Sequence, residues 1–332
     1  MNNLAQKALS QLKNLLPKQL NYERLLALVG LSYVSYHAAR LLYYSYAYLI
    51  RPRRNLLKRY GEGSWVVVTG ASEGIGKAFC LEFARMGFNI VLISRSVEKL
   101  TKAAEDIKAV NDKVQTKIIS ADFSQGYTLE FYENIAKQLE GLDISVLVNN
   151  VGARGSEYFH LWDEKRNLNF VVVNCLSQLM MSRTIIPLLL KREKKGAIID
   201  ISSTSQVRPM GWYVPYAPTK AFNRVLSQSL SKEYSKKIDI MACVVGAVST
   251  RLNFYNSSMT VTADKCVKGI IDQLGWGDYT SGNWRHAAYN TFIGSIPDFI
   301  FDRIWRKVGP NRIAWTKQEE AKEKELQSTQ NS

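Results

Sequence analysis

The stretch Thr69-Gly70-Ala71-Ser72-Glu73-Gly74-Ile75-Gly76 decides the fold of this chain. It follows an apolar, β-branched run at residues 65–68 and leads into residues 77–84, which have the pattern of a helix. A strand, a glycine-rich turn and a helix in this order hold a dinucleotide pyrophosphate, because glycines let the backbone approach the phosphates and the helix N-terminus offers free N–H groups. Glycines also mark ordinary turns, but this position between strand and helix favours nucleotide binding. The predicted cofactor-binding residues of the turn are Gly70, Ser72, Glu73, Gly74, Ile75 and Gly76.

From Trp65 onward, predicted strands and helices alternate along the chain. This alternation predicts an α/β fold of the Rossmann type, a doubly wound parallel sheet with helices on both faces. Strands are predicted at residues 65–68, 89–93, 117–121, 144–148, 197–201 and 240–245, and helices at 77–84, 98–110, 127–139, 165–191 and 215–235.

Composition narrows the class of partner. The chain has 332 residues, of which 46% are hydrophobic, and this content excludes wholesale disorder. Its net charge of +15 calls for an anionic partner. Without a nucleic-acid-binding motif, we expect a membrane surface or a phosphate-bearing cofactor and substrate rather than nucleic acid. Four cysteines and three histidines are scattered along the chain, so no metal site is predicted.

Residues 25–50 form an apolar segment in which Arg40 is the only charged residue. As a helix this segment would be about 39 Å long, which exceeds the ~30 Å hydrocarbon layer of a bilayer. Basic residues follow it more densely than they precede it, which favours a cytoplasmic location for the domain that follows. Arg40 and His37 interrupt the apolar run, so spanning and monotopic attachment both stay open, as does a soluble helix. We expect an amphipathic N-terminal segment at 1–24, a membrane-anchor helix at 25–50, a dinucleotide-binding domain at 51–315 and a charged tail at 316–332.

The end of the second predicted strand indicates which cofactor binds. An acidic residue there would hydrogen-bond the adenosine ribose, whereas a basic one would pair with a 2′-phosphate. Here Ser94 stands in the acidic position and Arg95 follows it, which favours NADP(H). The strand end at 149–152 places small and amide residues, Asn149 and Val151 among them, where a cofactor site should lie, although Asn and Gly also form simple turns.

Three residues form the predicted catalytic group. Tyr216 and Lys220 are four residues apart, so on a helix they share one face. A lysine ammonium stabilises a phenolate and lowers the tyrosine pKa, which makes Tyr216 a usable general acid or base. Ser203 ends a buried strand and could hydrogen-bond a carbonyl oxygen on which charge develops. Because Pro215 and Pro218 are tolerated only in the first helical turn, we expect this helix to begin near Pro215.

Taken together, the glycine turn, residues 149–152, Ser203 and the Tyr216-x-x-x-Lys220 pair resemble the short-chain dehydrogenase/reductase family. By that resemblance Asn174 holds a proton-relay water, Ser203 polarises the carbonyl and Tyr216 protonates it. Lys220 then binds the nicotinamide ribose and tunes Tyr216. The resemblance further assigns cofactor contacts to Asp122, Val248 and Thr250. The family usually has Pro-Gly after the sixth strand, where this chain has Val245-Gly246.

Within the family the chain is similar to a membrane-bound branch, the very-long-chain 3-oxoacyl-CoA reductases and the microsomal 17β-hydroxysteroid dehydrogenases. That similarity implies NADPH-dependent reduction of a 3-oxoacyl-CoA at the endoplasmic reticulum membrane, on its cytosolic face, alongside other fatty-acid elongation enzymes. A 17β-hydroxysteroid dehydrogenase or a 3-ketosphinganine reductase is the alternative, and a homodimer stays open. A non-catalytic cofactor-binding membrane partner is the alternative of another class, and the presence of Tyr216 argues against it. The apolar segment at 287–308 fits either a piece at the substrate mouth or bilayer, or a packed C-terminal helix.

Overall fold

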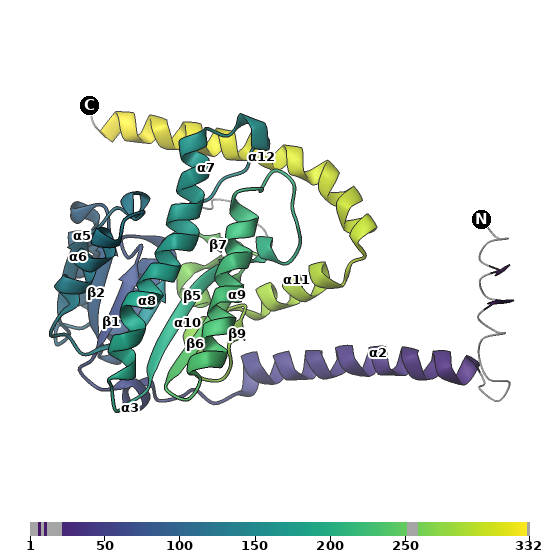
Figure 1. Ribbon diagram of the computed structural model, residues 1–332, viewed down its shortest axis with the longest axis horizontal. Coiled ribbons are helices and arrows are strands. Elements are labelled where there is room, and N and C mark those ends of the chain that lie inside the picture. The colour runs from purple at the N-terminus through teal and green to yellow at the C-terminus, as the bar shows by residue number, and fades with distance from the viewer. Residues whose placement is uncertain (1–5, 8–9, 12–21, 251–257, 331–332) are drawn as a thin grey trace. The chain divides into compact units, whose positions relative to one another are not determined.

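The strand at Trp65 is the first of a series that builds one parallel sheet (Figure 1). The computed structural model describes residues 6–7, 10–11, 22–250 and 258–330. Within these residues the sheet has seven strands in the order β3-β2-β1-β4-β5-β6-β9, and each neighbouring pair is parallel. They are β1 (Trp65–Thr69), β2 (Asn89–Ser94), β3 (Thr116–Ser120), β4 (Ile144–Asn149), β5 (Gly196–Ser203), β6 (Ile238–Val245) and β9 (Tyr279–Thr280), with a separate pair formed by β7 (Val248–Ser249) and β8 (Val261–Thr262).

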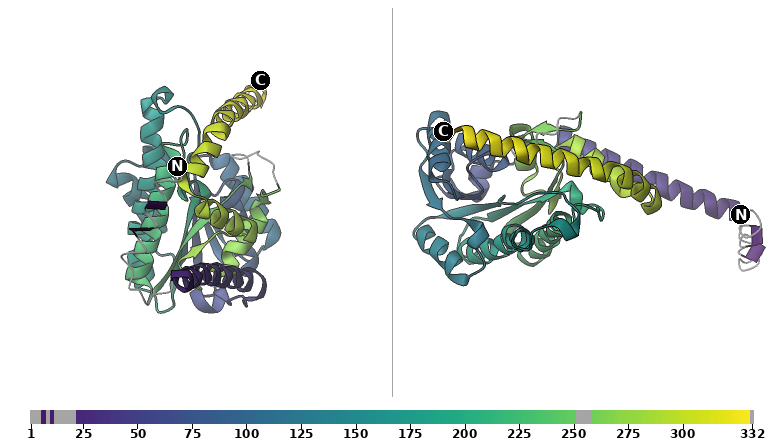
Figure 2. Two further views of the ribbon diagram at one scale, coloured as in Figure 1. Left: turned by 90° about the vertical axis from the view of Figure 1, so that its right-hand side faces the viewer. Right: turned by 90° about the horizontal axis from the view of Figure 1, so that it is seen from above.

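Helices cover both faces of the sheet, as Figures 1 and 2 show. On one face lie α4 (Gly74–Met86), α5 (Val97–Val110) and α10 (Ala263–Gln273), and on the other α6 (Leu129–Leu139), α8 (Ser177–Leu190) and α9 (Tyr216–Tyr234). The remaining α-helices of this unit are α3 (Leu56–Tyr60), α7 (Glu164–Val171), α11 (Trp284–Ser295) and α12 (Asp298–Gln330). A π-helical turn, η4 (Val172–Leu176), joins α7 to α8, and short 3₁₀ turns are η2 (Phe123–Gln125), η3 (Phe159–Leu161) and η5 (Thr204–Gln206).

Two hydrophobic cores flank the sheet because strand side chains alternate between its faces. In β1, Val66 and Val68 belong to the core under α4, α5 and α10, whereas Val67 belongs to the core under α6 and α8. All three are fully buried, and burying such a side chain contributes about 1.5–3 kcal/mol. A parallel strand buried on both faces reads as a continuous apolar run, which is the pattern seen at residues 65–68.

The structure confirms the predicted α/β class and the order of its central elements. Helix α9 begins at Tyr216 with Pro215 as its N-cap, so both prolines do lie at the first turn. The last strand, β9, was not predicted because its two residues are too short to show a period. Helix α12 continues through residue 315, so the expected start of a charged tail at 316 falls inside a helix.

The chain divides into two compact units, Met1–Arg51 and Pro52–Ser332. The first contains α2 (Tyr22–Ser45) and the π-helical turn η1 (Tyr46–Ile50), and together they are long and apolar enough to cross a membrane. Arg40, the charge inside this segment, donates to the Tyr44 hydroxyl at 3.1 Å and stacks against Tyr36 and Tyr44. Its guanidinium is therefore partnered within its own helix. The predicted amphipathic segment at 1–24 lies largely outside the described residues.

Strand order reverses between β1 and β4, which are adjacent although β2 and β3 intervene in sequence. In open α/β sheets a ligand binds in the crevice beyond the carboxyl ends of the strands at such a point. The glycine turn follows β1, and residues 149–152 begin at the last residue of β4, so these two predicted stretches meet there.

Candidate active site

The glycine turn has a backbone that only glycine fits. Gly70 and Gly74 have φ values of +65° and +60°, in the left-handed region. A Cβ on Gly76 would lie 2.1 Å from the Gly70 carbonyl oxygen. Helix α4 begins at Gly74, and the side chain of its N-cap, Glu73, makes no capping hydrogen bond. The first N–H groups of α4 are thus open to an anion, so the residues present fit a dinucleotide phosphate.

Thr69 and Asn150 hold this turn against the end of β4. The Thr69 hydroxyl accepts from the backbone N–H groups of Asn150 and Val151 at 3.0 and 3.1 Å and donates to Val148 at 3.2 Å. The Asn150 side chain donates to the carbonyls of Thr69 and Gly70 at 3.0 and 3.2 Å. These two residues were not among the predicted site residues, although both stand inside the stretches that the prediction used.

The end of β2 lies beside the turn. The hydroxyls of Ser72 and Ser94 are 3.2 Å apart, and Arg95, which follows, is exposed. Glu73, the nearby acid, lies 3.3 Å from the Lys99 ammonium. This edge of the crevice therefore presents hydroxyls and a guanidinium.

Three further predicted cofactor residues lie around the crevice. Thr250 lies against the glycine turn, since a Cβ on Gly74 would be 3.3 Å from its methyl group. Val248 is buried in β7. Asp122 accepts a hydrogen bond from Ser124 N at 3.0 Å and lines a surface hollow together with Phe131. It directly follows Ala121, whose backbone N–H donates to the Ser94 carbonyl at the end of β2.

Asn149 points into the protein interior. Its side chain is buried and donates to Asp200 at 2.8 Å and to Ser182 at 3.1 Å. Its amide thus serves a buried network under the crevice, while its neighbour Asn150 makes the contacts to the glycine turn.

Ser203, Tyr216 and Lys220 are brought together at the carboxyl end of β5. Ser203 is the last residue of β5, and its hydroxyl accepts from Ser205 N at 3.2 Å, which leaves its proton to donate. The Lys220 ammonium lies 5.9 Å from the centre of the Tyr216 ring and donates to Ile201 O at 3.0 Å. In the described part of the chain no side chain hydrogen-bonds the Tyr216 hydroxyl, so this group can serve a substrate.

Burial sets the charge state of Lys220. Loss of hydration lowers its pKa from 10.5 to about 8, while Cys175 and Asp200 act in the opposite direction. The side chain therefore still carries its proton at neutral pH. An ammonium held in a buried site interacts strongly with a phenolate because the local dielectric is low.

Asn174 occupies the π-helical turn η4, an irregularity often found at functional sites. Its amide accepts from Ala153 N at 2.7 Å and donates to Ala153 O at 3.0 Å and to Thr219 at 2.9 Å. A Cβ on Gly152 would lie 3.3 Å from both Asn174 Oδ1 and Lys220 Nζ. Gly152 therefore gives these two predicted residues room to approach each other.

Asp200 is a buried carboxylate that the prediction missed. It lies in β5 with no exposed surface, and burial raises its pKa to about 6. Asn149 and Lys220 favour its charged form. The available signal was an acid within the apolar run at 197–201, where a carboxylate needs a partner.

An aromatic wall stands next to Tyr216. Tyr213 contacts both Tyr216 and Trp305 through its ring, with ring centres 6.2 and 6.0 Å apart. Trp305 belongs to α12, stacks on Phe301 and donates to Gly211 O. The segment at 287–308 therefore packs beside the catalytic residues, as expected of a packed C-terminal helix, and a role at the substrate mouth or on the bilayer stays a prediction.

Arg208 fastens this wall to the loop that follows Ser203. Its side chain donates to the backbone carbonyls of Ile293 and Gly294 at 2.7 and 3.0 Å and also to that of Ile296. It pairs with Asp298 as well. One guanidinium thus closes the C-terminus of α11 and fixes the start of α12.

Gly246, in the position after β6 where the family pattern differs, packs against His286. A Cβ on Gly246 would lie 2.6 Å from His286 Cδ2. The imidazole is buried and lies 3.1 Å from the carbonyl of Ala247. Burial lowers the pKa of His286, so the ring is neutral at physiological pH.

Comparison with known proteins agrees with this geometry. Residues 64–260 match the short chain dehydrogenase family. The chain is 37% identical to mouse 17-beta-hydroxysteroid dehydrogenase type 3 over 243 residues, covering 72% of this chain and 78% of that protein. It is 38% identical to zebrafish very-long-chain 3-oxoacyl-CoA reductase-B over 249 residues (73% and 78%), and 35% identical to human inactive hydroxysteroid dehydrogenase-like protein 1 over 300 residues (86% and 88%).

Solved structures share the fold. A structure from work on 7beta-hydroxysteroid dehydrogenase stereoselectivity has a TM-score of 0.67 at 23% identity and covers 80% of this chain and 100% of its own. The NADPH complex of L-sorbose reductase from Gluconobacter frateurii has a TM-score of 0.60 at 20% identity, covering 67% and 96%. This chain therefore belongs to the short-chain dehydrogenase family, in its membrane-associated branch, and is an NAD(P)-dependent oxidoreductase acting on CH–OH and C=O groups.

Proposed function

We propose that this protein uses NADPH to reduce a lipid ketone, a very-long-chain 3-oxoacyl-CoA, to the 3-hydroxyacyl-CoA in fatty-acid elongation. The observation that carries the proposal is the convergence of Ser203, Tyr216 and Lys220 beside a glycine turn whose helix N-terminus is open. The aromatic wall at Tyr213 and Trp305 gives this site an apolar side suited to a lipid.

The chain's own residues supply the proton chemistry. When bound, the nicotinamide supplies a hydride to the carbonyl carbon. Ser203 donates a hydrogen bond to the carbonyl oxygen as negative charge grows there. Tyr216 gives that oxygen its proton, and the Lys220 ammonium stabilises the phenolate that is left. Asn174 keeps the Ala153 backbone fixed on one side of this group.

Residues at the end of β2 support NADPH over NADH. Arg95 is exposed there, and Ser72 and Ser94 offer hydroxyls where an acid would select the unphosphorylated ribose. Glu73 is engaged by Lys99, which reduces its repulsion of a 2′-phosphate. We assign the 2′-phosphate to Arg95 and Ser72, and adenine to the side of Asp122.

The names of two relatives support a lipid substrate, namely a very-long-chain 3-oxoacyl-CoA reductase and a 17-beta-hydroxysteroid dehydrogenase. A 17-ketosteroid and 3-ketosphinganine are the alternative ketones. We further propose that Tyr22–Ile50 anchors the protein in the endoplasmic reticulum membrane, with the catalytic unit in the cytosol. Fatty-acid elongation enzymes would then be its neighbours, and a homodimer is a further proposal.

The alternative class of function is a non-catalytic membrane protein that binds the cofactor. It has to be considered because the human relative is named an inactive hydroxysteroid dehydrogenase-like protein. The presence of Tyr216, Lys220 and Ser203 in one site argues for catalysis.

The test is NADPH oxidation by the purified full chain with a long 3-oxoacyl-CoA, a 17-ketosteroid or 3-ketosphinganine. We expect turnover to be fastest with the 3-oxoacyl-CoA and to fall by about 10²-fold or more in Tyr216→Phe. NADPH binding, followed by its fluorescence, should be unchanged in that variant. NADPH binding without turnover of any of the three ketones would overturn the proposal that the protein is a reductase. Faster turnover of the ketosteroid or of 3-ketosphinganine would make that ketone the proposed substrate in place of the acyl-CoA.

A further inference from the structure

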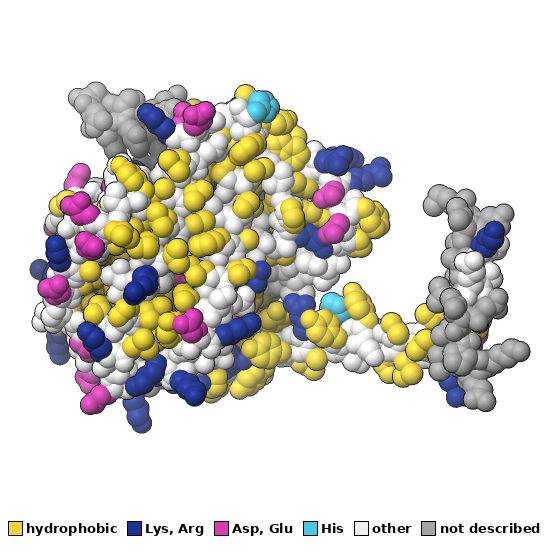
Figure 3. Space-filling model, viewed as in Figure 1, with side chains coloured by type: hydrophobic (Ala, Val, Ile, Leu, Met, Phe, Trp, Pro, Cys, Tyr) yellow, Lys and Arg dark blue, Asp and Glu magenta, His cyan; other side chains and the backbone are white. Residues whose placement is uncertain are grey.

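The amino end of the sheet, opposite the catalytic residues, carries a group of exposed lysines. Three segments meet there: α3 before β1, the turn at 191–195 before β5 and the turn at 235–237 before β6. In Figure 3 Lys and Arg side chains gather along this margin, which is where α3 lies in Figure 1. We call the following exposed residues the basic edge: Lys58, Lys191, Lys194, Lys236 and Lys237.

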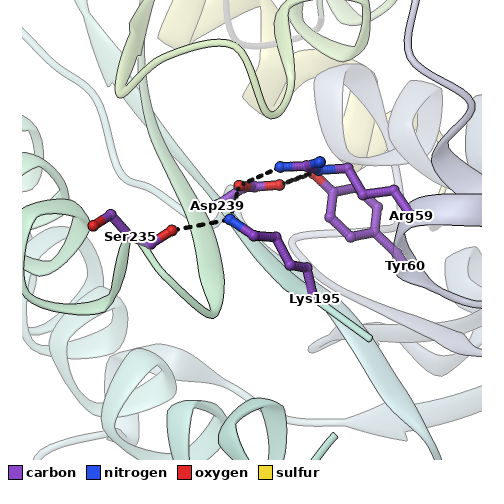
Figure 4. Close-up of polar contacts among 5 residues, drawn as sticks. All are labelled: Arg59, Tyr60, Lys195, Ser235 and Asp239. Atoms are coloured by element: carbon purple, nitrogen blue, oxygen red, sulfur yellow. Dashed lines mark hydrogen bonds and ion pairs between the residues drawn. The ribbon is translucent and has the colours of Figure 1, made fainter. Parts of the chain in front are cut away.

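Asp239 joins the three segments into one surface (Figure 4). Its carboxylate accepts from Arg59 at 2.5 and 2.9 Å and from the Tyr60 hydroxyl at 2.8 Å. Lys195 lies 3.2 Å from the same carboxylate and donates to Ser235 O at 2.9 Å. Because these side chains are largely buried, the segments that bear the lysines are held in place.

Cations on this surface divide into two groups. Arg59, Lys195 and Arg192 turn inward, and Arg192 donates to Tyr60 O and pairs with Asp143. The lysines of the basic edge extend into solvent. The exposed acids nearby include Glu62, Asp143, Glu193 and Glu233, and Asp143 is already paired with Arg192. The five lysines of the basic edge, together with Arg59, Arg192 and Lys195, outnumber these acids and Asp239, so the surface remains positive.

The chain enters the catalytic unit on the side that carries this surface. Ile50 ends the apolar helix, and Pro52 opens the catalytic unit only two residues later. Arg53 then pairs with Asp272 at 2.8 Å, and Arg54 stacks 3.8 Å from the centre of the Trp276 ring. The point of entry is therefore fixed to the unit at its amino edge. If Tyr22–Ile50 is embedded, the chain enters the catalytic unit close to the headgroups, and the basic edge is a positive surface on the entry side of that unit.

We propose that the basic edge binds anionic lipid headgroups and thereby orients the catalytic unit on its membrane. The proposal rests on the membrane attachment proposed above. Lysine suits this role because it is a compact charge on a flexible stem that can follow mobile phosphates. Each lysine near an anionic surface strengthens binding by about fivefold, and salt screens the effect. The carboxyl ends of the same strands then face the aqueous side.

The first experiment measures lysine acetylation by a water-soluble reagent, residue by residue, on the full chain in nanodiscs. One sample contains phosphatidylcholine only, and the other adds phosphatidylserine. We expect Lys191, Lys194, Lys236 and Lys237 to react about fivefold more slowly in the anionic discs, and to regain their rates in about 1 M salt, where the Debye length is about 3 Å. Exposed lysines near helix starts at the other edge, Lys165 and Lys265, serve as internal controls and should not change.

Equal rates in both discs would overturn the proposal, as would slowing of the control lysines to the same degree. Protection that is already present in detergent would also overturn it, because a protein contact would then cover the surface. Flotation of the full chain with phosphatidylcholine vesicles tests the membrane anchor separately. Failure of the proposed anchor is therefore distinguishable from failure of the basic edge to bind anionic lipid.

A second experiment uses variants. In the wild type, we expect backbone hydrogen exchange at residues 191–195 to be slower in the anionic discs than in the phosphatidylcholine discs. The quadruple variant Lys191→Gln, Lys194→Gln, Lys236→Gln and Lys237→Gln should lose this difference in exchange rate. A matched variant, Lys165→Gln with Lys265→Gln, should keep it. Both should retain NADPH turnover in detergent, because none of these residues belongs to the catalytic site. A retained lipid difference in the quadruple variant would refute the assignment.

Discussion

Replacing Lys220 by Met separates the stability of the unit from its chemistry. Burial lowers the pKa of Lys220 from 10.5 to about 8, so the folded protein holds this proton less tightly than the unfolded chain. Below pH 8 both states are protonated, and the folded state carries the full cost of the buried charge, about 3 kcal/mol at 1.36 kcal/mol per pH unit. Between pH 8 and 10.5 the unfolded state binds more protons, so stability rises with pH and the cost disappears.

Methionine has a similar volume and no charge, so the variant escapes this cost. It also leaves the Ile201 carbonyl without its donor, which costs about 1–3 kcal/mol, and it removes a favourable charge from Asp200. We expect a small net gain at pH 7, about 1 kcal/mol, and a net loss above pH 10.5. Turnover should fall by about 10²-fold or more, since Tyr216 loses its ammonium.

The assay is thermal unfolding of both proteins in detergent without cofactor, from pH 7 to pH 10.5, with turnover measured in parallel. The informative quantity is the change in the difference between variant and wild type. A difference that stays constant across this range would refute the account of Lys220 as a buried charge. Unimpaired turnover would refute its part in the proton chemistry.

Three other substitutions test neighbouring parts of the site. Gly76→Ala should weaken NADPH binding roughly ten- to hundredfold by fluorescence titration, because its Cβ would lie 2.1 Å from a backbone oxygen; normal affinity would show that the turn can relax. Asp200→Asn should raise the free energy of unfolding by up to about 3 kcal/mol above pH 6, because burial raises the pKa of Asp200 from 3.8 to about 6. This gain should vanish as the pH falls towards 3.8. Thermal unfolding with the same pH dependence in variant and wild type would contradict it. Arg208→Lys should raise the KM for the ketone several-fold while NADPH affinity stays unchanged, because a lysine cannot donate to the carbonyls of Ile293 and Gly294 in the geometry of the guanidinium. A loss of NADPH affinity with an unchanged KM for the ketone would contradict this role.

The alternating centre of the fold was readable because its strands are buried on both faces and show as apolar runs, as at Val66–Val68. The cofactor turn was equally readable, since each glycine answers a backbone need that other residues cannot meet. The spacing of four residues placed Tyr216 and Lys220 on one helix face, and the glycine turn and Ser203 in the same domain singled the pair out. In each of these cases the constraint acts between residues close in sequence.

Contacts between distant segments were not readable. Asn149 and Asn150 look alike in the sequence, yet alternation along β4 and its end sends one amide to Asp200 and the other to the glycine turn. The Arg208 contacts with α11 and α12 span more than eighty residues and follow no period. The wall beside Tyr216 is built from such contacts, which is why substrate choice was the least accessible property.

The length of β5 links the two ends of the catalytic unit. This strand begins next to Lys195, which belongs to the Asp239 cluster, and ends at Ser203. Its eight residues cover about 26 Å at roughly 3.3 Å per residue. With the basic edge on the headgroups, a ketone at Ser203 would lie up to about that far from the membrane surface. A substrate carried on a water-soluble group can reach this position more readily than one dissolved in the bilayer, so this orientation favours a 3-oxoacyl-CoA over a ketosteroid.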